Sequence, residues 1–322
     1  MQLPSKILVT GGAGFIGSHL VAYLLRAGCA VTVVDDFNDY YDPALKRRNV
    51  AAWGDRVRVI QADICDQAPL RDVFRGGAFD AVVHLAARAG VRPSLQQPAL
   101  YSQVNVVGTQ NLLDLARAAG VPKFIFASSS SVYGLGNRAP FREADAITRP
   151  ISPYAATKLA GEALCHVAHH LYGMDVACLR LFTVYGPRQR PDLAIHKFTR
   201  AILTGDRLEV YGDGSALRDF THVDDVVDGL VACLTRRLGY EIINLGESRT
   251  ISVRELIQLI EHCAGRRANI EWQPAQPGDV PLTHADVTKA RELLDYRPSR
   301  PIAAGIEQFV AWMREQTGLE AG

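Results

Sequence analysis

Short apolar runs alternate with segments of helical periodicity from residue 6 to residue 182. Six runs are rich in β-branched residues and contain few polar positions, which is typical of strands buried on both faces of a parallel sheet. The strand-like runs span residues 6–10, 30–34, 57–61, 81–85, 123–127 and 175–182, and helical patterns at 15–26, 68–74 and 99–119 separate them. The pattern therefore predicts an α/β fold built on a doubly wound parallel sheet.

The regular alternation of strand-like runs and helical patterns ends after residue 183. Proline or glycine interrupts three stretches that we expect to form loops or turns, at residues 186–192, 211–215 and 271–281. A helix at 223–235 and an apolar strand at 241–245 lie between them, and we expect both to return to the main sheet. We therefore expect one lobe from residues 1–183 with 223–246, and a smaller α/β lobe mainly from residues 184–322.

The overall charge of the chain excludes some classes of partner. The 322 residues include 35 Lys and Arg against 34 Asp and Glu, a formal net charge of +1. This balance gives no global attraction to nucleic acid or to an anionic membrane. No apolar run approaches the roughly 20 residues of a membrane-spanning helix, and the first residues lack the regions of a secretory signal. We therefore expect a cytoplasmic protein with neither a membrane nor a nucleic-acid partner.

Cysteines and histidines do not form a metal-ligand pattern. The six cysteines are scattered and include no C-x-x-C pair, so we expect reduced core thiols and no disulfides. His166, His169 and His170 share one face of a predicted helix, but no cysteine or carboxylate nearby completes a ligand set. We expect that face to be solvated and predict no metal site.

A glycine series follows the first predicted strand. Gly11, Gly14 and Gly17 recur every three residues, with Phe15 and Ile16 between them at the start of a predicted helix. Glycine permits the tight turn and lets the backbone approach a pyrophosphate without a Cβ in the way. The helix N-terminus then presents free N–H groups to the phosphates. These five residues are therefore predicted to bind a dinucleotide in a Rossmann-type turn.

Two acidic residues follow the second and third predicted strands. Asp35 lies 18 positions after Gly17 (35 − 17), near the spacing of an acid that binds the adenosine ribose hydroxyls. A carboxylate at that position would repel a 2′-phosphate, so the predicted cofactor is NAD rather than NADP. Asp63, which precedes Ile64, is a candidate neighbour of the adenine, although a turn residue at the end of a strand explains its position equally well.

A Y-x-x-x-K pair opens the helix that follows the fifth strand. Tyr154 and Lys158 are four positions apart, which places both side chains on one helix face. A nearby ammonium lowers the pKa of a phenol from its usual value of about 10, and the positive nicotinamide ring would do the same. The fifth strand ends in four serines at 128–131, and a hydroxyl at that edge can polarise a carbonyl. We therefore predict catalytic roles for this pair and for the serine segment.

Seven motifs give the chain a family resemblance. They are TGGAGFIG (10–17), HLAA (84–87), NVVGT (105–109), SSSSVYG (128–134), YAATK (154–158), RDF (218–220) and PGD (277–279). Over essentially its whole length, the sequence resembles the extended short-chain dehydrogenase/reductase family, and specifically the nucleotide-sugar epimerases. The resemblance implies that Tyr154 is the base and that Ser129, with Ser131 beside it, binds the reacting sugar oxygen. It also implies further cofactor contacts from Ile64, Leu85, Ala86, Ala87, Asn105, Ser128, Lys158 and Phe182.

Within that family the sequence looks most like the UDP-glucuronate 4-epimerases. Three stretches suggest this, at residues 36–42 with 46–48, at 182–192 and at 276–281. A UDP-sugar substrate needs an anchor remote from the sugar pocket. Arg218 suits a bidentate diphosphate contact, Tyr211 can pack on the uracil and Asp279 can hold the ribose. A surface salt bridge is the alternative for Arg218.

The expected reaction interconverts UDP-glucuronate and UDP-galacturonate through a 4-keto intermediate. We hypothesise that Thr183 hydrogen-bonds the sugar carboxylate and that Arg190 supports it or closes the pocket. A plain strand-end hydroxyl and an exposed loop charge are the respective alternatives.

Two rival functions remain at the level of sequence. One is a 4-epimerase of neutral UDP-hexoses or N-acetylhexosamines, and the other is a non-catalytic NAD-binding regulator on the same fold. The serine segment contains no Asp or Glu, which argues against a dehydratase or decarboxylase. The resemblance also implies a homodimer that pairs the helices at 99–119 and 154–172 of each subunit.

Overall fold

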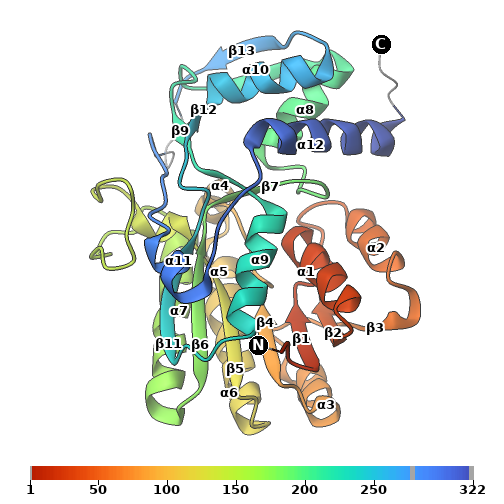
Figure 1. The fold of residues 1–322 in the computed structure, drawn as a ribbon, viewed down its shortest axis with the longest axis vertical. Helices are drawn as coiled ribbons and strands as arrows, with labels where there is room; N and C mark the ends of the chain where they lie inside the picture. The colour runs from red at the N-terminus through yellow and green to blue at the C-terminus, as the bar shows by residue number, and fades with distance from the viewer. Residues whose placement is uncertain (1, 276–279, 319–322) are drawn as a thin grey trace.

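The computed structural model describes residues 2–275 and 280–318. In this part of the chain, seven parallel strands form the central sheet, in the order β11-β6-β5-β4-β1-β2-β3 (Figure 1). The strands are β1 (Lys6–Thr10), β2 (Ala30–Asp35), β3 (Val57–Gln61), β4 (Ala81–His84), β5 (Lys123–Ser129), β6 (Asp175–Leu181) and β11 (Tyr240–Leu245). The prediction of a doubly wound parallel sheet is therefore confirmed.

Helices cover both faces of the sheet. On one face α1 (Phe15–Arg26) packs against α9 (Val223–Leu234), and on the other α6 (Gly108–Ala118) packs between α3 (Gln67–Gly77) and α7 (Pro153–Tyr172). The shorter helices around the sheet are α2 (Pro43–Ala51), α4 (Val91–Gln96), α5 (Pro98–Ser102) and α11 (Thr288–Leu294). The 3-10 turns are η1 (Gly54–Arg56) and η3 (Ser130–Tyr133).

Strand β1 shows why the predicted runs are apolar throughout. Ile7 and Val9 lie in the core on the α1 and α9 side, whereas Leu8 lies in the core on the α3, α6 and α7 side. All three side chains are completely buried. Because alternate residues of a strand point to opposite faces, only an apolar run satisfies both cores.

The predicted helix at 99–119 is interrupted. Its middle is a π-helical segment, η2 (Gln103–Val107), between α5 and α6. Asn105 lies in this segment and is buried, and its side-chain amide contacts the backbone of Arg88 and the hydroxyl of Thr157. The prediction of one regular helix was wrong here because local periodicity does not register these contacts, each of which spans many residues.

A second layer lies beyond the carboxyl ends of the strands. It contains α8 (Ala194–Thr204), α10 (Val253–Ala264) and α12 (Ile302–Thr317), and Figure 1 shows these helices above the sheet. Two parallel strands, β8 (Arg207–Tyr211) and β13 (Asn269–Gln273), pair beside them. The start of the stretch 271–281, expected to be a loop, is therefore strand.

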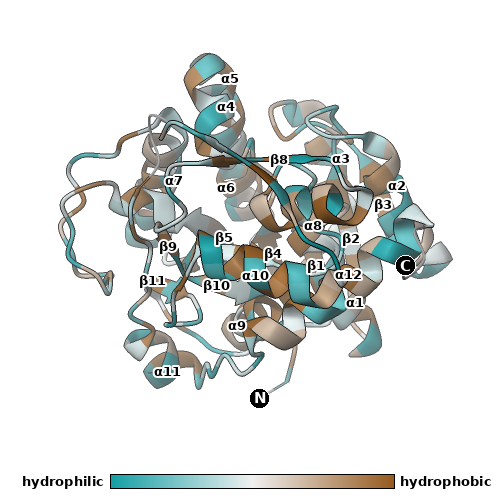
Figure 2. Cartoon of the chain, turned by 90° about the horizontal axis from the view of Figure 1, so that it is seen from above, coloured by the Kyte–Doolittle hydropathy of each residue, from teal (hydrophilic) through white to brown (hydrophobic). Residues whose placement is uncertain are grey.

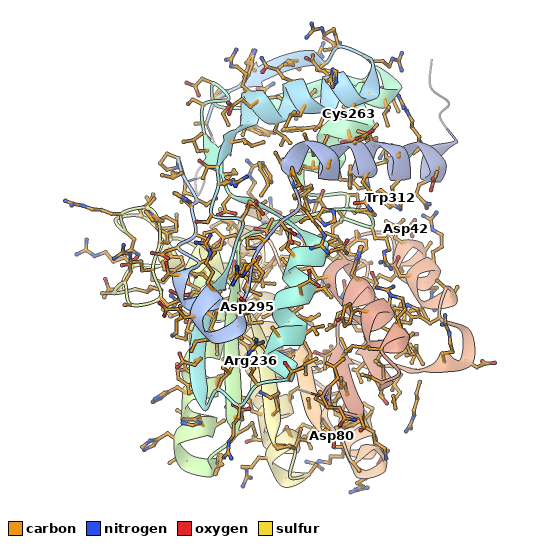
Figure 3. All side chains as sticks on the ribbon, viewed as in Figure 1. Asp42, Asp80, Arg236, Cys263, Asp295 and Trp312 are labelled. Carbon is orange, nitrogen blue, oxygen red and sulfur yellow. The ribbon has the colours of Figure 1, made fainter. Side chains whose placement is uncertain are left out.

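Apolar side chains hold this second layer together. Its core includes Tyr185, Ile202, Leu256 and Phe309. Figure 2 shows the helices of the layer from above, and Figure 3 shows Cys263 on α10 and Trp312 on α12 within it. Two short strand pairs lie between the two layers: β7 (Thr183–Tyr185) with β10 (Phe220–His222), and β9 (Leu217–Arg218) with β12 (Ile251–Ser252).

All six cysteines are free thiols, as expected, although Cys65 and Cys263 are only half-buried.

The ring of His166 stacks on that of His170, with centroids 6.2 Å apart, and meets Tyr240 edge-on. Among the described residues, no group of His, Cys, Asp or Glu is arranged to hold a metal ion. Nor does any helix of residues 2–275 and 280–318 have the length and apolar character to cross a membrane.

Close packing of α7 on β5 yields a stability prediction. A Cβ at Gly161 would lie 2.3 Å from Cζ of Phe126. We expect Gly161→Ala to lower the free energy of unfolding by about 1–3 kcal/mol, measured by urea denaturation, because the added methyl group overpacks the core. Gly76→Ala in α3 is the matched control, since the nearest atom to its Cβ would be 3.7 Å away. We expect it to raise stability by about 0.5–1 kcal/mol, and an equal loss at both positions would contradict the packing argument.

Candidate active site

A cleft of about 380 Å³ opens at the carboxyl edge of the sheet. Its walls come from the loops that follow β1, β2, β3, β4, β5 and β6. This edge is where ligands bind in doubly wound folds. The predicted site residues that line it are Gly11, Gly14, Phe15, Ile16, Gly17, Asp35, Asp63, Ile64, Leu85, Ala86, Ala87, Ser128, Ser129, Ser131, Tyr154, Lys158, Phe182, Thr183 and Arg190.

The glycine turn has no room for side chains. Gly11 has φ of +68°, and a Cβ on it would lie 2.6 Å from the backbone nitrogen of Ala86. A Cβ on Gly17 would lie 2.3 Å from the carbonyl oxygen of Gly11, where α1 begins next to β1. These approaches bring backbone N–H groups and the α1 N-terminus to the cleft, as dinucleotide binding requires.

Two predicted carboxylates lie farther along this wall. The Asp35 carboxylate is buried and accepts hydrogen bonds from the backbone N–H groups of Ala13 (3.1 Å) and Phe37 (3.0 Å). Burial raises the pKa of Asp35, and the nearby ammonium of Lys46 opposes this. Asp63 lines the cleft, and its carboxylate accepts a hydrogen bond from the N–H of Cys65 at 2.8 Å. It is therefore a turn residue at the end of β3, and its role as a neighbour of the adenine stays a prediction.

The proton-transfer candidates meet where β5 ends beside the start of α7. The Ser129 hydroxyl lies near enough to the Tyr154 phenol to lower its pKa, and its Oγ accepts a hydrogen bond from the Ser131 N–H at 3.1 Å. The Tyr101 ring meets the Tyr154 ring edge-on, with centroids 6.2 Å apart. Lys158 is buried and donates to the carbonyl oxygen of Ala127 at 2.7 Å.

The effect of Lys158 on the pKa of Tyr154 stays a prediction. Burial raises the pKa of Tyr154, and the opposing influences are the Ser129 hydroxyl and the charge of Arg190. The Lys158 ammonium lies 6.0 Å from the Tyr154 ring centroid and donates to the Ala127 carbonyl oxygen. Burial also lowers the pKa of Lys158 to about 8. Spacing of i, i+4 placed the two residues on one face but could not give the direction of the ammonium.

Sequence reasoning missed a buried ion pair beneath the serine segment. Arg180 donates from Nε and Nη2 to the two carboxylate oxygens of Glu162, at 2.9 and 2.8 Å. The hydroxyl of Ser128 donates to the same carboxylate at 2.5 Å. Both charged side chains are only 3% exposed. The pair therefore supports β5 just before Ser129, and apolar periodicity contains no signal for it.

The opposite wall combines the predicted residues Arg190 and Thr183 with Tyr40 and Asp192, which sequence reasoning did not select. The Arg190 guanidinium donates from Nε and Nη2 to Asp192, at 2.9 and 2.8 Å, and lies over the Tyr40 ring. Tyr40 in turn donates to Asp192 at 3.4 Å. Thr183 begins β7 in the same wall. The stretch 36–42 was noted as a motif, but its individual side chains were not assigned.

Three predicted site residues that the structure describes do not line the cleft. Asn105 is behind the cleft, where it orders the backbone of Arg88. Tyr211 ends β8 and faces the Arg92 guanidinium at 4.7 Å. Arg218 lies in β9 and donates to the Leu217 carbonyl oxygen at 2.9 Å. Asp279 lies outside the described residues, so the assignments to the UDP anchor stay predictions.

Comparison with known proteins matches this arrangement to one family. The model of the NAD dependent epimerase/dehydratase family matches residues 7–246. The chain belongs to this family. The match covers the glycine turn, Asp35, the serine segment and Tyr154 with Lys158, so the contacts described above are those of an NAD-dependent enzyme family.

Relatives of this family are similar over nearly the whole chain. The sequence is 43% identical to a UDP-glucuronate 4-epimerase of Thermodesulfobacterium geofontis over 315 residues, 97% of each chain. It is 40% identical to UDP-glucuronate 4-epimerase 4 of Arabidopsis thaliana, over 95% of this chain and 74% of that one. A crystal structure of UDP-glucuronic acid 4-epimerase from Bacillus cereus, in complex with UDP-glucuronic acid and NAD, superposes with a TM-score of 0.90 at 37% identity. That superposition covers 97% of this chain and 99% of the other.

The buried ion pair yields a prediction for the site. Glu162→Gln leaves the Arg180 charge buried without a counter-charge, and we expect it to lower the free energy of unfolding by about 3–5 kcal/mol. The exposed pair of Asp72 and Arg75, at 78% and 77% exposure, supplies the control. Asp72→Asn is expected to change stability by less than about 0.5 kcal/mol. If urea denaturation gave equal values for the two variants, the supporting role of Glu162 would be excluded.

Proposed function

We propose that the protein is an NAD-dependent 4-epimerase that interconverts UDP-glucuronate and UDP-galacturonate through a 4-keto intermediate. One observation supports this most directly: Tyr154 and Ser129 line the same cleft as the glycine turn and Asp35. The site thus combines a dinucleotide-binding wall with a proton-transfer group. The relatives described above bear the same activity in their names.

In the proposed reaction, Tyr154 takes the proton of the sugar 4-hydroxyl and Ser129 orients that hydroxyl. Bound NAD supplies reversible hydride acceptance from carbon 4, so the reaction has no net redox change. Tyr154 then returns the proton to the new 4-hydroxyl on the opposite face of the ring. Ser129 and Arg190 favour the phenolate that this cycle needs, against the burial that disfavours it.

Epimerisation requires the 4-keto sugar to turn over while the nucleotide stays fixed. The proposed anchor comes from the lobe of residues 184–322, with Arg218 on the diphosphate, Tyr211 on the uracil and Asp279 on the ribose. The lobe of residues 1–183 with 223–246 holds NAD. This division keeps tight binding away from the sugar pocket, where the ring must rotate.

A uronate substrate adds a hazard that the site must control. Oxidation at carbon 4 makes a β-keto acid, whose bond between carbons 5 and 6 breaks with loss of carbon dioxide when it aligns with the carbonyl π system. Thr183 and Arg190 both line the cleft and are the groups we propose to hold the carboxylate out of that alignment. The serine segment has no acidic residue to promote elimination.

We also propose that the protein acts in the cytoplasm as a homodimer. Val107 at the π segment, and Val167 and Leu171 on α7, are large apolar side chains that are exposed. They lie on the two helices that the family resemblance assigns to a four-helix interface. Pairing these helices would remove that apolar surface from water.

The first test identifies the product. Purified protein is incubated with UDP-glucuronate, UDP-glucose and UDP-N-acetylglucosamine, without added NAD, and the products are followed by NMR. We expect UDP-galacturonate from the uronate, with Tyr154→Phe slower by about 10²–10⁴-fold. Tyr101→Phe is the matched control, because that hydroxyl donates to the Ala89 carbonyl oxygen and Tyr101 does not line the cleft. Turnover of the neutral sugars alone would favour the rival epimerase, and no turnover of any sugar would favour a regulator.

The second test concerns the carboxylate. Thr183→Val removes one hydrogen bond, a contribution of about 0.5–1.5 kcal/mol. We expect the ratio of UDP-pentose to UDP-galacturonate in the NMR spectrum to rise by about two- to tenfold. Thr183→Ser retains the hydroxyl and should retain the wild-type ratio. A wild-type ratio in Thr183→Val would exclude Thr183 from this role.

A further inference from the structure

The buried guanidinium of Arg180 is linked to both ends of the segment that carries Ser129. Before Ser129, the Ser128 hydroxyl donates to Glu162 at 2.5 Å, and Glu162 accepts two hydrogen bonds from Arg180. After Ser129, the turn η3 ends at Tyr133, and Cζ of Arg180 lies over the ring of this tyrosine, 4.8 Å from its centroid. A single side chain of β6 therefore acts on the segment from both sides of Ser129.

The Tyr133 end of the segment is fixed by further contacts. The Tyr133 ring is 2% exposed and stacks on the Phe141 ring, with centroids 4.9 Å apart. Its hydroxyl donates to Oδ1 of Asn244 at 2.7 Å. Asn244 is completely buried in β11, and its Nδ2 donates to the Phe141 carbonyl oxygen at 2.9 Å. Arg180 therefore packs on a ring that cannot move without breaking these contacts.

Ser129 lies between the two linked ends. Its Oγ accepts a hydrogen bond from the Ser131 N–H at 3.1 Å, at the start of η3. The Ser129 hydroxyl also lowers the pKa of Tyr154 against the effect of burial. Hydrogen bonds weaken steeply with distance and angle. A small shift of the segment would therefore weaken the effect of Ser129 on the phenol.

Stability alone does not explain a charged pair at this position. The side chains of Arg180 and Glu162 are both 3% exposed, and an apolar pair of the same volume is often as stable as a buried ion pair. Nη1 of Arg180 is buried without a hydrogen-bond partner in the described part of the chain, which adds a cost. An apolar pair, however, lacks the rigid fork and planar group of a guanidinium. The fork binds Glu162 while the same group lies over Tyr133.

We propose that Arg180 is a positioning residue that holds the serine segment at both ends and so fixes Ser129 against the Tyr154 side chain. Arg180 acts through Glu162 and Tyr133 and does not line the cleft itself. The proposal rests on the proposed function, because it concerns the placement of the proton-transfer groups assigned there.

The first variant is Arg180→Lys, which keeps the charge that balances Glu162 but has neither the fork nor the planar group. With NAD bound, we expect the pKa of Tyr154 to rise by about 1, measured by NMR of isotope-labelled tyrosine and assigned with Tyr154→Phe. A rise of that size lowers the phenolate fraction, and with it kcat, by about tenfold at a pH below that pKa. KM for UDP-glucuronate should stay within about twofold, because the proposed UDP anchor is remote from the serine segment.

Other groups near the phenol are left in place by this substitution. Arg190 lowers the pKa of Tyr154, the Lys158 ammonium lies 6.0 Å from its ring centroid, and the Tyr101 ring meets it edge-on. A rise in the pKa of Tyr154 therefore reports the position of Ser129 rather than the loss of a neighbouring charge.

The matched control removes another buried ion pair between β5 and β6, which are neighbouring strands (Figure 1). Nζ of Lys123 lies 2.6 Å from Oδ2 of Asp175 at the other edge of the sheet, and these side chains are 12% and 11% exposed. Lys123→Met with Asp175→Asn removes both charges and keeps an oxygen for the N–H groups of Leu238 and Gly239, which Asp175 binds. We expect kcat within about twofold of wild type and an unchanged pKa of Tyr154, even if the unfolding temperature falls.

A second variant, Ser128→Ala, tests the link before Ser129 with both buried charges in place. It removes one hydrogen bond, so we expect the pKa of Tyr154 to rise and kcat to fall by about two- to tenfold. The NAD content of the purified protein, measured after denaturation, should remain that of wild type. This measurement separates a shifted Ser129 from lost cofactor binding.

Each outcome decides the proposal. A wild-type pKa of Tyr154 in Arg180→Lys, or effects equal to those of the control, would overturn it. If Arg180→Lys does not fold, Ser128→Ala decides in the same way, and a loss of NAD without a change in that pKa would also overturn the proposal. The pKa of Tyr154 is measured without substrate. Its expected rise, in a protein that does not epimerise UDP-glucuronate, would contradict the proposed function alone.

Discussion

In the proposed reaction the partly buried phenol of Tyr154 must lose its proton, and its burial opposes that loss. The position of Tyr154 follows from the close packing of α7 on β5, which the missing side chain of Gly161 permits. The same packing places the phenol near Ser129, at the end of β5. Low dielectric makes every remaining charge and hydrogen bond count for more. Ser129 and Arg190 therefore lower the pKa of the phenol against the larger effect of burial, although neither is proposed as an acid or a base in the reaction.

Arg190 lies in the same cleft as Tyr154 and lowers the pKa of its phenol, whereas the sequence motif pointed to Lys158 alone. A Y-x-x-x-K spacing suggests that Lys158 acts on the phenol directly. In the folded chain the Lys158 ammonium donates one hydrogen bond to the Ala127 carbonyl oxygen in β5. Arg190 arrives from a loop after β7 and is oriented by both oxygens of Asp192. A motif gives residue types and a shared helix face, whereas the electrostatics depends on segments that are distant in sequence.

The same distinction separates what could be predicted from what could not. The sheet could be predicted from the apolar runs because a strand such as β1 must bury both of its faces. The glycine turn could be predicted because no other residue type fits the close backbone contacts at Gly11 and Gly17. The Glu162 and Arg180 pair was invisible, because residues 18 apart meet only when α7 packs on β6. The parallel pairing of β8 with β13 joins strands that are widely separated in sequence, and no periodicity encodes it. The π segment at Asn105 similarly depends on contacts with Arg88 and Thr157.

Buried charges in the cleft walls are compatible with a cofactor that does not need to leave. A dehydrogenase must exchange its dinucleotide in every cycle, so tight walls would slow its turnover. In the proposed reaction the hydride returns to the same sugar, and no exchange is required. The loop at 36–42 supplies Tyr40, which donates to Asp192 of the opposite wall, so the cofactor end and the sugar end of the cleft are connected. In the proposed reaction, a wall connected in this way can retain the dinucleotide without limiting the rate, because the cycle requires no exchange of the cofactor.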